Sequence, residues 1–349
     1  MSEIFVCGAG VVSPAGWGMN AFREALTRGE AVATKALPRP GHTPLQVRQV
    51  PVATPRPAFL AHPRLRRTSP MAHYTVSAAL EALGEDAAKV SSGALKLGII
   101  YCALSGCVNY SRRFYDEVLK DPSTASPLVF PETVYNSPAS HLASLVGTTG
   151  INYTLVGDPG TFLQGLVLAA DWLMEGRVDA CLVIGAEEMD WLTAGAIHLF
   201  EREAIFSDGA GVIYLRREAG ANAMARLNAV TNAHIYTNRM CRAEAIRLAR
   251  EELRREQTER MLGAPGRALL CDGLQGLAAP DRDEQAAWRD WTGARVSVKP
   301  ILGEALMASA AWQCVAAVDA LARKAYDAAS VSVAGTNQQA IAAQFISIS

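Results

Sequence analysis

The sequence predicts an α/β protein built from two similar halves. Short apolar runs that end in glycine or another small residue alternate with longer segments of helical periodicity, as expected where helices cover buried strands. Two successive sets of these runs have similar content, and segments 179–185 and 327–335 echo each other. The chain has 349 residues, of which 50% are hydrophobic and 19% charged, so it is long enough to bury a large core.

Each strand is expected where an apolar run of strand length is bounded by turn residues. The first set of strands is expected at 3–9, 96–103, 151–156, 180–185 and 210–216. The second set is expected at 224–230, 267–271, 294–298, 329–334 and 341–348. Helical periodicity predicts helices at 19–28, 68–84, 137–146, 160–175, 238–261 and 304–325.

The two sets of elements define two expected units, 1–217 and 218–349. Segment 33–63 holds several prolines and few periodic apolar positions, so it is interpreted as a surface excursion. Segment 251–260 alternates opposite charges, which is typical of the solvated face of a helix.

Charge and cysteine content exclude several classes of function. The formal net charge is -1, which removes the general electrostatic attraction to nucleic acid or to an anionic membrane. The seven cysteines form no CxxC pair, so we expect reduced thiols in a cytoplasmic protein. No apolar stretch of about 20 residues predicts a membrane span. We expect neither nucleic acid nor membrane as a partner, and no metal or other cofactor.

Six segments occur in an order that is similar to a known family. They are VCGAGVVSPAGWGMNAFREAL, PETVYNSPASHLASLVGTTGINYTL, EGRVDACLVIGAEE, SDGAGVIYL, VKPILGEAL and VAGTN. On these segments the chain resembles the β-ketoacyl synthase family of the thiolase fold over essentially its whole length. The resemblance implies a five-layered αβαβα core of two related halves, usually assembled as a dimer across a strand near the active site.

The resemblance also implies a catalytic set that this sequence lacks. The family uses a Cys nucleophile at a helix start and two His residues that hold the thioester oxygen during decarboxylative condensation. All six His residues lie before position 235. The aligned positions hold Pro159 for the Cys, Asp272 and Glu304 for the two imidazoles, the retained Lys299, Gln313 for an acidic residue, and Val333 for a gating aromatic in the loop before Gly335.

The replacements have their own physical logic. Asp is a strong N-cap and Pro is favoured at the first helical position, so Asp158 and Pro159 predict a well-capped helix start. Ionised carboxylates at Asp272 and Glu304 would repel an enolate. They could form a structural network with Lys299, or burial could raise their pKa values and leave one protonated. Asp281 and Glu284 match a family Asp-x-x-Glu element with one inserted residue, and the start of a helix is sufficient to explain them.

Three functions are compatible with this pattern. The first is a non-catalytic subunit similar to the chain-length factors of type II polyketide synthases, without condensation activity of its own. The second is a thiolase-fold decarboxylase or hydrolase that uses Asp158, Asp272 or Glu304. The third is a structural scaffold. Simultaneous loss of the Cys, both His and the acidic residue favours the first, and the compact chain resembles partner subunits of aryl polyene systems.

A chain-length factor implies a specific partner and a specific surface. We expect a heterodimer with a catalytic β-ketoacyl synthase, paired through the strand at 151–156, and an acyl carrier protein that acts through the complex. Tyr110, Phe114 and Tyr115, in segment 106–118, are expected to approach the acyl tunnel of the partner. The alternative is that these aromatic side chains pack a helix in the chain's own core.

Overall fold

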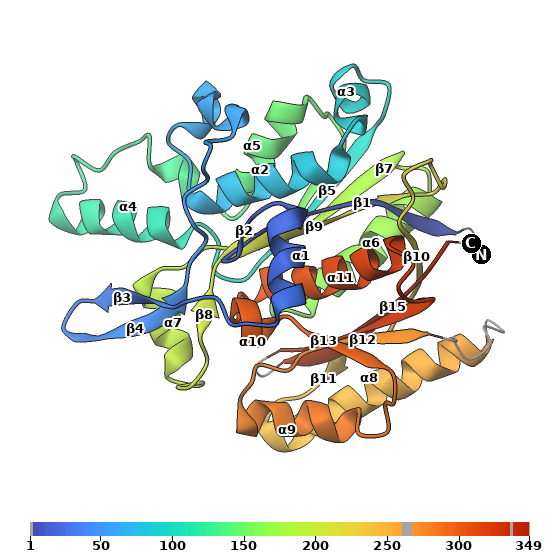
Figure 1. Ribbon diagram of the computed structural model, residues 1–349. Helices are drawn as coiled ribbons and strands as arrows, with labels where there is room; N and C mark the ends of the chain where they lie inside the picture. The colour runs from blue at the N-terminus through green and yellow to red at the C-terminus, as the bar shows by residue number, and fades with distance from the viewer. Residues whose placement is uncertain (1–2, 260–266, 336–337, 349) are drawn as a thin grey trace.

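The computed structural model describes residues 3–259, 267–335 and 338–348. Thr336 and Asn337, which belong to the last of the six segments, lie outside the described residues. Strands and helices alternate along the chain, so the predicted α/β class is confirmed. Figure 1 shows helices on both outer faces of the strands and further helices between them.

The strands of the N-terminal half form one side of a continuous sheet. They are β1 (Ile4–Ser13), β5 (Leu97–Ala103), β6 (Asn152–Val156), β7 (Ala180–Glu187) and β9 (Gly209–Arg216). Their order across the sheet is β1-β9-β7-β5-β6. β5 runs parallel to both β6 and β7, whereas β9 is antiparallel to β7 and β1. All five predicted strands of this half are confirmed.

The strands of the C-terminal half repeat the same arrangement. They are β10 (Ala225–Val230), β12 (Ala268–Asp272), β13 (Ala294–Ser297), β14 (Ala328–Ala334) and β15 (Gln339–Ile346), in the order β10-β15-β14-β12-β13. β12 is parallel to β13 and β14, and β15 is antiparallel to β14 and β10. β1 and β10 pair antiparallel and join the halves. The predicted repeat is therefore confirmed, while the boundary at 217/218, between β9 and β10, remains a proposal.

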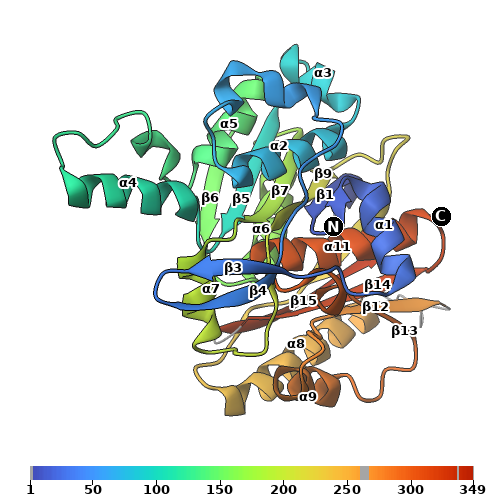
Figure 2. The same ribbon diagram turned by 60° about the vertical axis from the view of Figure 1, so that its left-hand side comes forward.

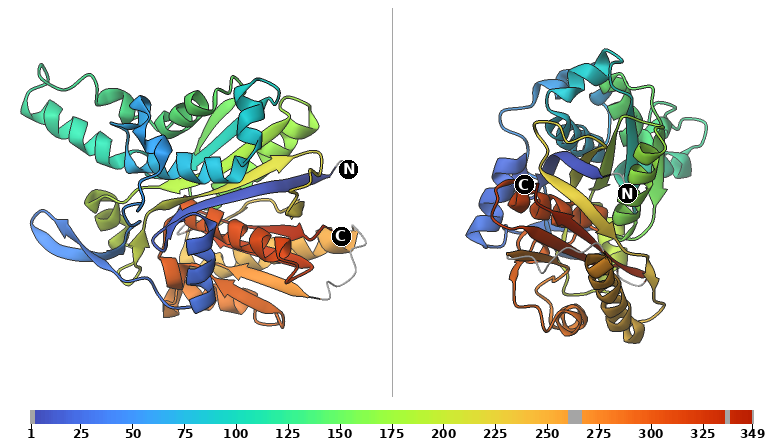
Figure 3. Two further views of the ribbon diagram at one scale, coloured as in Figure 1. Left: turned by 45° about the horizontal axis from the view of Figure 1, so that its top comes forward. Right: turned by 90° about the vertical axis from the view of Figure 1, so that its right-hand side faces the viewer.

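The helices complete five layers (Figures 1 and 3). α2 (Pro70–Leu83) and α5 (Ser137–Val146) cover the outer face of the first half, and α8 (Arg239–Glu259) and α9 (Ala278–Ala287) cover that of the second. α6 (Thr161–Met174) and α11 (Met307–Ala322) run between the sheets, with α11 against β7 and β9 on one side and β12 and β14 on the other. The αβαβα core expected from the resemblance is confirmed.

The central helix α11 is buried along almost its full length. The strands that pack against it have glycine at the two positions of closest approach. Residues 307–321 are all buried. A Cβ atom added at Gly211 would lie 2.6 Å from the Cβ of Ala311, and one added at Gly185 would lie 2.5 Å from the carbonyl oxygen of Met307. No side chain fits at that separation, so glycine at these two positions allows the close packing of helix and sheet.

Two segments project from the same side of this core (Figure 2). One is the hairpin of β3 (Lys35–Arg39) and β4 (His42–Arg48), which forms a separate small sheet with β8 (Phe206–Ser207). The other is α4 (Val108–Lys120), followed by η3 (Phe130–Glu132). Segment 33–63 was interpreted as a surface excursion; it does project from the core, but it also forms β3 and β4, and Leu45 and Val47 of β4 point inward into a small hydrophobic cluster.

The remaining elements are short or lie at the edges. They are β2 (Gly16–Trp17), α1 (Met19–Arg28), η1 (Ala58–Ala61), η2 (Pro63–Leu65), α3 (Asp86–Ser91), α7 (Trp191–His198), β11 (His234–Ile235) and α10 (Lys299–Leu302). Within the described ranges, no helix is long and apolar enough to cross a membrane.

Candidate functional site

The nucleophile position lies between β6 and α6, and the structure corrects the expected helix start there. α6 begins at Thr161 with Gly160 as its N-cap, so Asp158 is not the N-cap and Pro159 is not the first helical residue. The amide of Thr161 donates to the carbonyl of Asp158 over 2.9 Å, which forms a tight turn before the helix. The Asp158 carboxylate accepts from the Gly160 amide over 3.1 Å instead. Pro159 is buried in this turn.

Asp158 is fixed by contacts with the other half of the molecule. Its Oδ2 accepts from the backbone amide of Gln339 over 3.2 Å, and its Oδ1 from the Gln339 side-chain amide over 2.5 Å. Gln339 is held in turn by Gln164 of α6, whose Nε2 donates to Oε1 over 3.2 Å. Burial raises the pKa of Asp158, and these amide donors oppose the rise. Both oxygens are occupied by amides, which leaves the carboxylate poorly placed to act as a base.

Asp272, at the position of the first imidazole, ends β12 and is fully buried. Its Oδ1 accepts from the Ser297 hydroxyl over 2.6 Å, and its Oδ2 lies 3.7 Å from Nη1 of Arg295. Burial raises the pKa of Asp272, while Ser297 and Arg295 oppose the rise. Gln313 of α11 donates from Nε2 to the carbonyl of Asp272 over 2.7 Å and to that of Ser332 over 2.8 Å. Gln313 thereby ties the ends of two strands together.

Glu304, at the position of the second imidazole, forms the other buried ion pair. Nζ of Lys299 lies 2.7 Å from its Oε2, and both side chains are almost wholly inaccessible. Its Oε1 accepts from the backbone amide of Leu306 over 2.8 Å. Of the two alternatives left open by the sequence, Glu304 adopts the network with Lys299. Asp272 instead contacts Ser297 and Arg295 of β13, and burial raises its pKa.

Two further carboxylates organise the loop after β12, and the sequence analysis gave them only a helical role. Asp281 does lie in the first turn of α9, as expected. It also accepts the amides of Gln275, Gly276 and Leu277 over 2.7, 2.8 and 2.9 Å. Glu284 is buried and accepts the Gly273 amide over 3.2 Å. The Asp-x-x-Glu spacing is the feature of the sequence that could have predicted these contacts with the loop.

The expected tunnel residues lie mainly on the projecting helix α4. Tyr110 and Phe114 are half-buried, and the rings of Phe114 and Phe130 are 5.4 Å apart. Tyr115 is 62% exposed. Val108 is the one residue of this helix that is buried, so these aromatics do not pack the chain's own core. Val333 lies within β14 rather than in the following loop, and it is buried in the main hydrophobic core.

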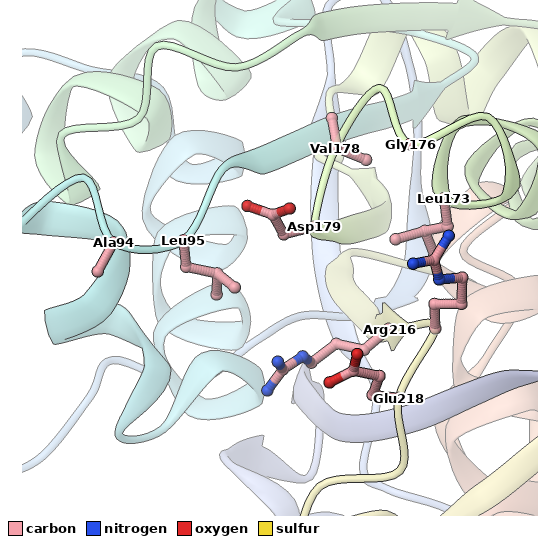
Figure 4. Close-up of a pocket in the computed structure, with 9 residues that line it drawn as sticks. Ala94, Leu95, Leu173, Gly176, Val178, Asp179, Arg216 and Glu218 are labelled. Carbon is pink, nitrogen blue, oxygen red and sulfur yellow. The ribbon is translucent and has the colours of Figure 1, made fainter.

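Two cavities stand out in the described part of the chain. One, of about 290 Å³, is lined by Lys299 and Glu304 among others. The other, of about 310 Å³, lies at the start of β7 and the end of β9, where Asp179, Arg216 and Glu218 line it (Figure 4). None of the predicted site residues lines this second cavity. No group of three His, Cys, Asp or Glu side chains in the described ranges could hold a metal ion.

Comparison with known proteins decides the family. Residues 1–213 match the family model described as β-ketoacyl synthase, N-terminal domain. The chain belongs to the β-ketoacyl synthase family. No curated protein matches its sequence. The six segments that carried the resemblance therefore identified the family correctly.

Solved structures show the same fold at low sequence identity. The chain is similar to the ishigamide ketosynthase/chain length factor, with a TM-score of 0.81, 18% identity, and coverage of 99% of this chain and 100% of that one. It is similar to a β-ketoacyl synthase from Burkholderia phymatum STM815, with a TM-score of 0.80, 16% identity, and 100% coverage of both chains.

A third similar structure contains a carrier protein. It is AntDE:AntF, a type II polyketide synthase acyl-carrier protein in complex with its ketosynthase bound to the hexaketide. The TM-score is 0.76 at 15% identity, with 99% of each chain covered. At these identities the three comparisons establish the thiolase-like ketosynthase fold of this chain.

Proposed function

We propose that the chain is a non-catalytic ketosynthase-like subunit, a chain-length factor, that pairs with an active β-ketoacyl-ACP synthase. The observation that carries the proposal is the closed nucleophile position. Pro159 has no nucleophilic atom, and both oxygens of the neighbouring Asp158 accept amide hydrogen bonds. The sequence has no histidine after His234, so segment 235–349, which contains Asp272 and Glu304, supplies no imidazole with which to stabilise an enolate.

The alternative of a hydrolase or decarboxylase finds no support in the carboxylates it would need. Asp158 is occupied by amides and Glu304 is paired with Lys299. Asp272 accepts from Ser297, lies 3.7 Å from Arg295 and is fully buried, so a substrate does not reach it. A general base needs an oxygen that can reach a substrate proton. We therefore retain the partner-subunit function. Its cytoplasmic location and its place in an aryl polyene system remain predictions from the sequence.

The edge strand β6 supports pairing with a ketosynthase. Among the described strands, β6 pairs with β5 alone, and it presents Tyr153 and Val156, each 54% exposed. An apolar edge with unpaired backbone groups is usually covered by another chain. Leu119, Leu128 and Phe130, on or after α4, are also more than half exposed. In the heterodimer, α4 reaches the partner and brings Tyr110 and Phe114 to its acyl tunnel.

A basic surface supports docking of an acyl carrier protein. Residues 31–80 contain no Asp or Glu. Within this stretch, the exposed arginines Arg56, Arg64, Arg66 and Arg67 gather around η1 and η2. Such a patch attracts an acidic protein surface at low ionic strength. We propose that the carrier protein of the complex contacts these arginines.

Co-expression with an active ketosynthase whose gene lies beside that of this chain tests the proposed function. We expect a one-to-one heterodimer that extends an acyl chain, whereas neither subunit alone does so. Tyr153→Asp should abolish the heterodimer because it places a charge on the paired edge. Val52→Asp is the matched control, since Val52 is 90% exposed and lies away from β6. A heterodimer that survives Tyr153→Asp, or extension activity from this chain alone, would contradict the proposal.

A further inference from the structure

The cavity of about 290 Å³ beside Lys299 is a second candidate site, separate from the closed nucleophile position. It lies between β4, the segment before β8, the loop after β12, and α10, which are close together in Figure 1. Its lining includes Arg48, Ile205, Gln275, Leu277, Lys299 and Glu304. Apolar walls with a few convergent polar groups are typical of small-molecule sites.

Arg48 is the unusual member of this lining. The residue is only 8% exposed, and burial lowers the pKa of its guanidinium. Nε donates to the carbonyl of Val32 over 2.7 Å, and Nη1 reaches the carbonyl of Lys299 at 3.5 Å. No carboxylate of the described residues lies within ion-pair distance of Arg48. A buried charge without a counter-charge is costly, and a ligand that brought one would bind favourably.

The charge of the other buried groups in the cavity limits the ligand to one negative charge. The positive charge of Lys299 is already compensated by Glu304 at 2.7 Å. Glu203, which also lines the cavity, is exposed and would repel a second anionic group at the mouth. One guanidinium therefore remains uncompensated, and its two-nitrogen fork matches a carboxylate.

Gln275 adds a requirement for a hydrogen-bond donor. Its Oε1 is buried and has no hydrogen-bond partner among the described residues. The backbone of Gln275 is held by Asp281, whose carboxylate accepts a hydrogen bond from the Gln275 amide over 2.7 Å. An unpartnered buried carbonyl oxygen costs free energy, and a rotation of the side-chain amide toward the cavity would let a hydroxyl or amine of a ligand recover it.

We propose that this cavity binds a small monocarboxylate that carries a hydroxyl or amino group. Its carboxylate pairs with the guanidinium of Arg48, and its donor hydrogen-bonds to Oε1 of Gln275. Binding is non-covalent, and it does not depend on the proposed role in chain elongation.

Four matched probes test this site on the full-length chain by ligand-observed NMR titration. They are 3-hydroxybutyrate, butyrate, 1,3-butanediol and inorganic phosphate. We expect 3-hydroxybutyrate to bind with a dissociation constant on the order of 1 mM. Butyrate should bind about fivefold more weakly because it lacks the donor. The diol and phosphate should not bind measurably. Tighter binding of the diol or of phosphate would overturn the assignment.

Two variants separate the two contacts. Arg48→Gln should weaken the binding of both carboxylates about tenfold or more. Arg28→Gln is its control, because Arg28 is exposed and lies outside the cavity. Because Arg48 also holds two carbonyls, Gln275→Met provides a variant that removes no internal hydrogen bond of its side chain. This variant should lower the affinity for 3-hydroxybutyrate to that for butyrate, and it should leave the affinity for butyrate unchanged. Unchanged binding of 3-hydroxybutyrate in Gln275→Met, or in a folded Arg48→Gln, would overturn the proposal.

Discussion

The two central helices occupy equivalent places between the sheets, yet their first turns are built differently. α6 starts with Gly160 in an ordinary right-handed conformation, and the preceding Asp158 is bound by neutral amides. α11 starts after Leu306, a non-glycine residue with φ of 50°, which costs about 1 to 3 kcal/mol. Glu304 holds that strained amide and is itself paired with Lys299.

The difference shows that the two helix starts are held by unrelated contacts. At α6 a relaxed turn and uncharged donors hold the position that we propose to be closed. At α11 the structure keeps a strained backbone and depends on a buried ion pair to stabilise it. The stability of the two helix starts should therefore respond very differently to substitution, and neither should recover activity by a single change.

The largest expected effect comes from breaking the ion pair at α11. Lys299→Met leaves Glu304 buried and unpaired, and should lower the free energy of unfolding by about 3 to 5 kcal/mol. The double variant Lys299→Met with Glu304→Gln removes the orphaned charge and should recover part of that loss. Urea unfolding of both variants checks this. Equal destabilisation in the single and double variants would show that the charge pairing is unimportant.

The second effect concerns pH and the ends of two equivalent strands. Burial raises the pKa values of Glu187 and Glu188, at the end of β7, to about 7, whereas β14, the equivalent strand, ends in Ala334. The folded state therefore retains protons that the unfolded chain loses near its ordinary pKa of about 4.5. The stabilising contribution of these two groups should be complete below that value and fall by on the order of 3 kcal/mol per group as the pH rises to about 7.

Thermal unfolding between pH 5 and pH 8 measures this dependence. The variant Glu187→Gln should flatten the profile, because one of the two groups no longer titrates. The slope is the relevant quantity, since the variant also changes hydrogen bonds to Leu104 and Ser105. A profile as steep as that of the unchanged protein would rule out this origin for the pH dependence.

A smaller effect is expected at α6. Asp158→Ala removes a buried acceptor of three amide hydrogen bonds and should cost about 1 to 3 kcal/mol. Because no charged partner is orphaned, the loss should be smaller than that of Lys299→Met. Urea unfolding on the same scale compares them directly. A loss at Asp158 equal to or larger than the loss at Lys299 would reverse the comparison of the two helix starts.

The smallest effect is expected from restoring the nucleophile alone. Pro159→Cys should cost about 0.4 to 1 kcal/mol by freeing the unfolded backbone. It should give no condensation activity, because catalytic groups act as a unit and no imidazole is supplied. A turnover assay with an acyl carrier protein thioester checks this. Activity above that of the unchanged chain would show that the positions at Asp272 and Glu304 still function.

The sequence predicted the central strands well because they are local and almost wholly apolar. β7 and β9 are buried along nearly their full length, so a short run of apolar residues is sufficient to find them. The helix α4 was not predicted as an element, and its aromatic side chains are half-buried or exposed rather than packed in the main core. We expect these side chains to contact another molecule, so the apolar face of α4 does not pack against the chain's own core.

The site was predictable in its residue types but not in its pairings. The alignment of motifs located Pro159, Asp272 and Glu304. Gln339, which binds Asp158, is 181 residues away in the chain, and nothing local predicts that contact. The start of α6 was misplaced for the same reason, since the capping propensity of Asp158 is outweighed by its hydrogen bonds to Gln339.

Intact mass spectrometry of the reconstituted pair tests the central claim most directly. The heterodimer would be incubated with an acyl carrier protein thioester, and the mass of each subunit would be measured. We predict a stoichiometric acyl adduct on the ketosynthase partner and an unmodified mass for this chain. A stoichiometric acyl adduct on this chain would contradict the account.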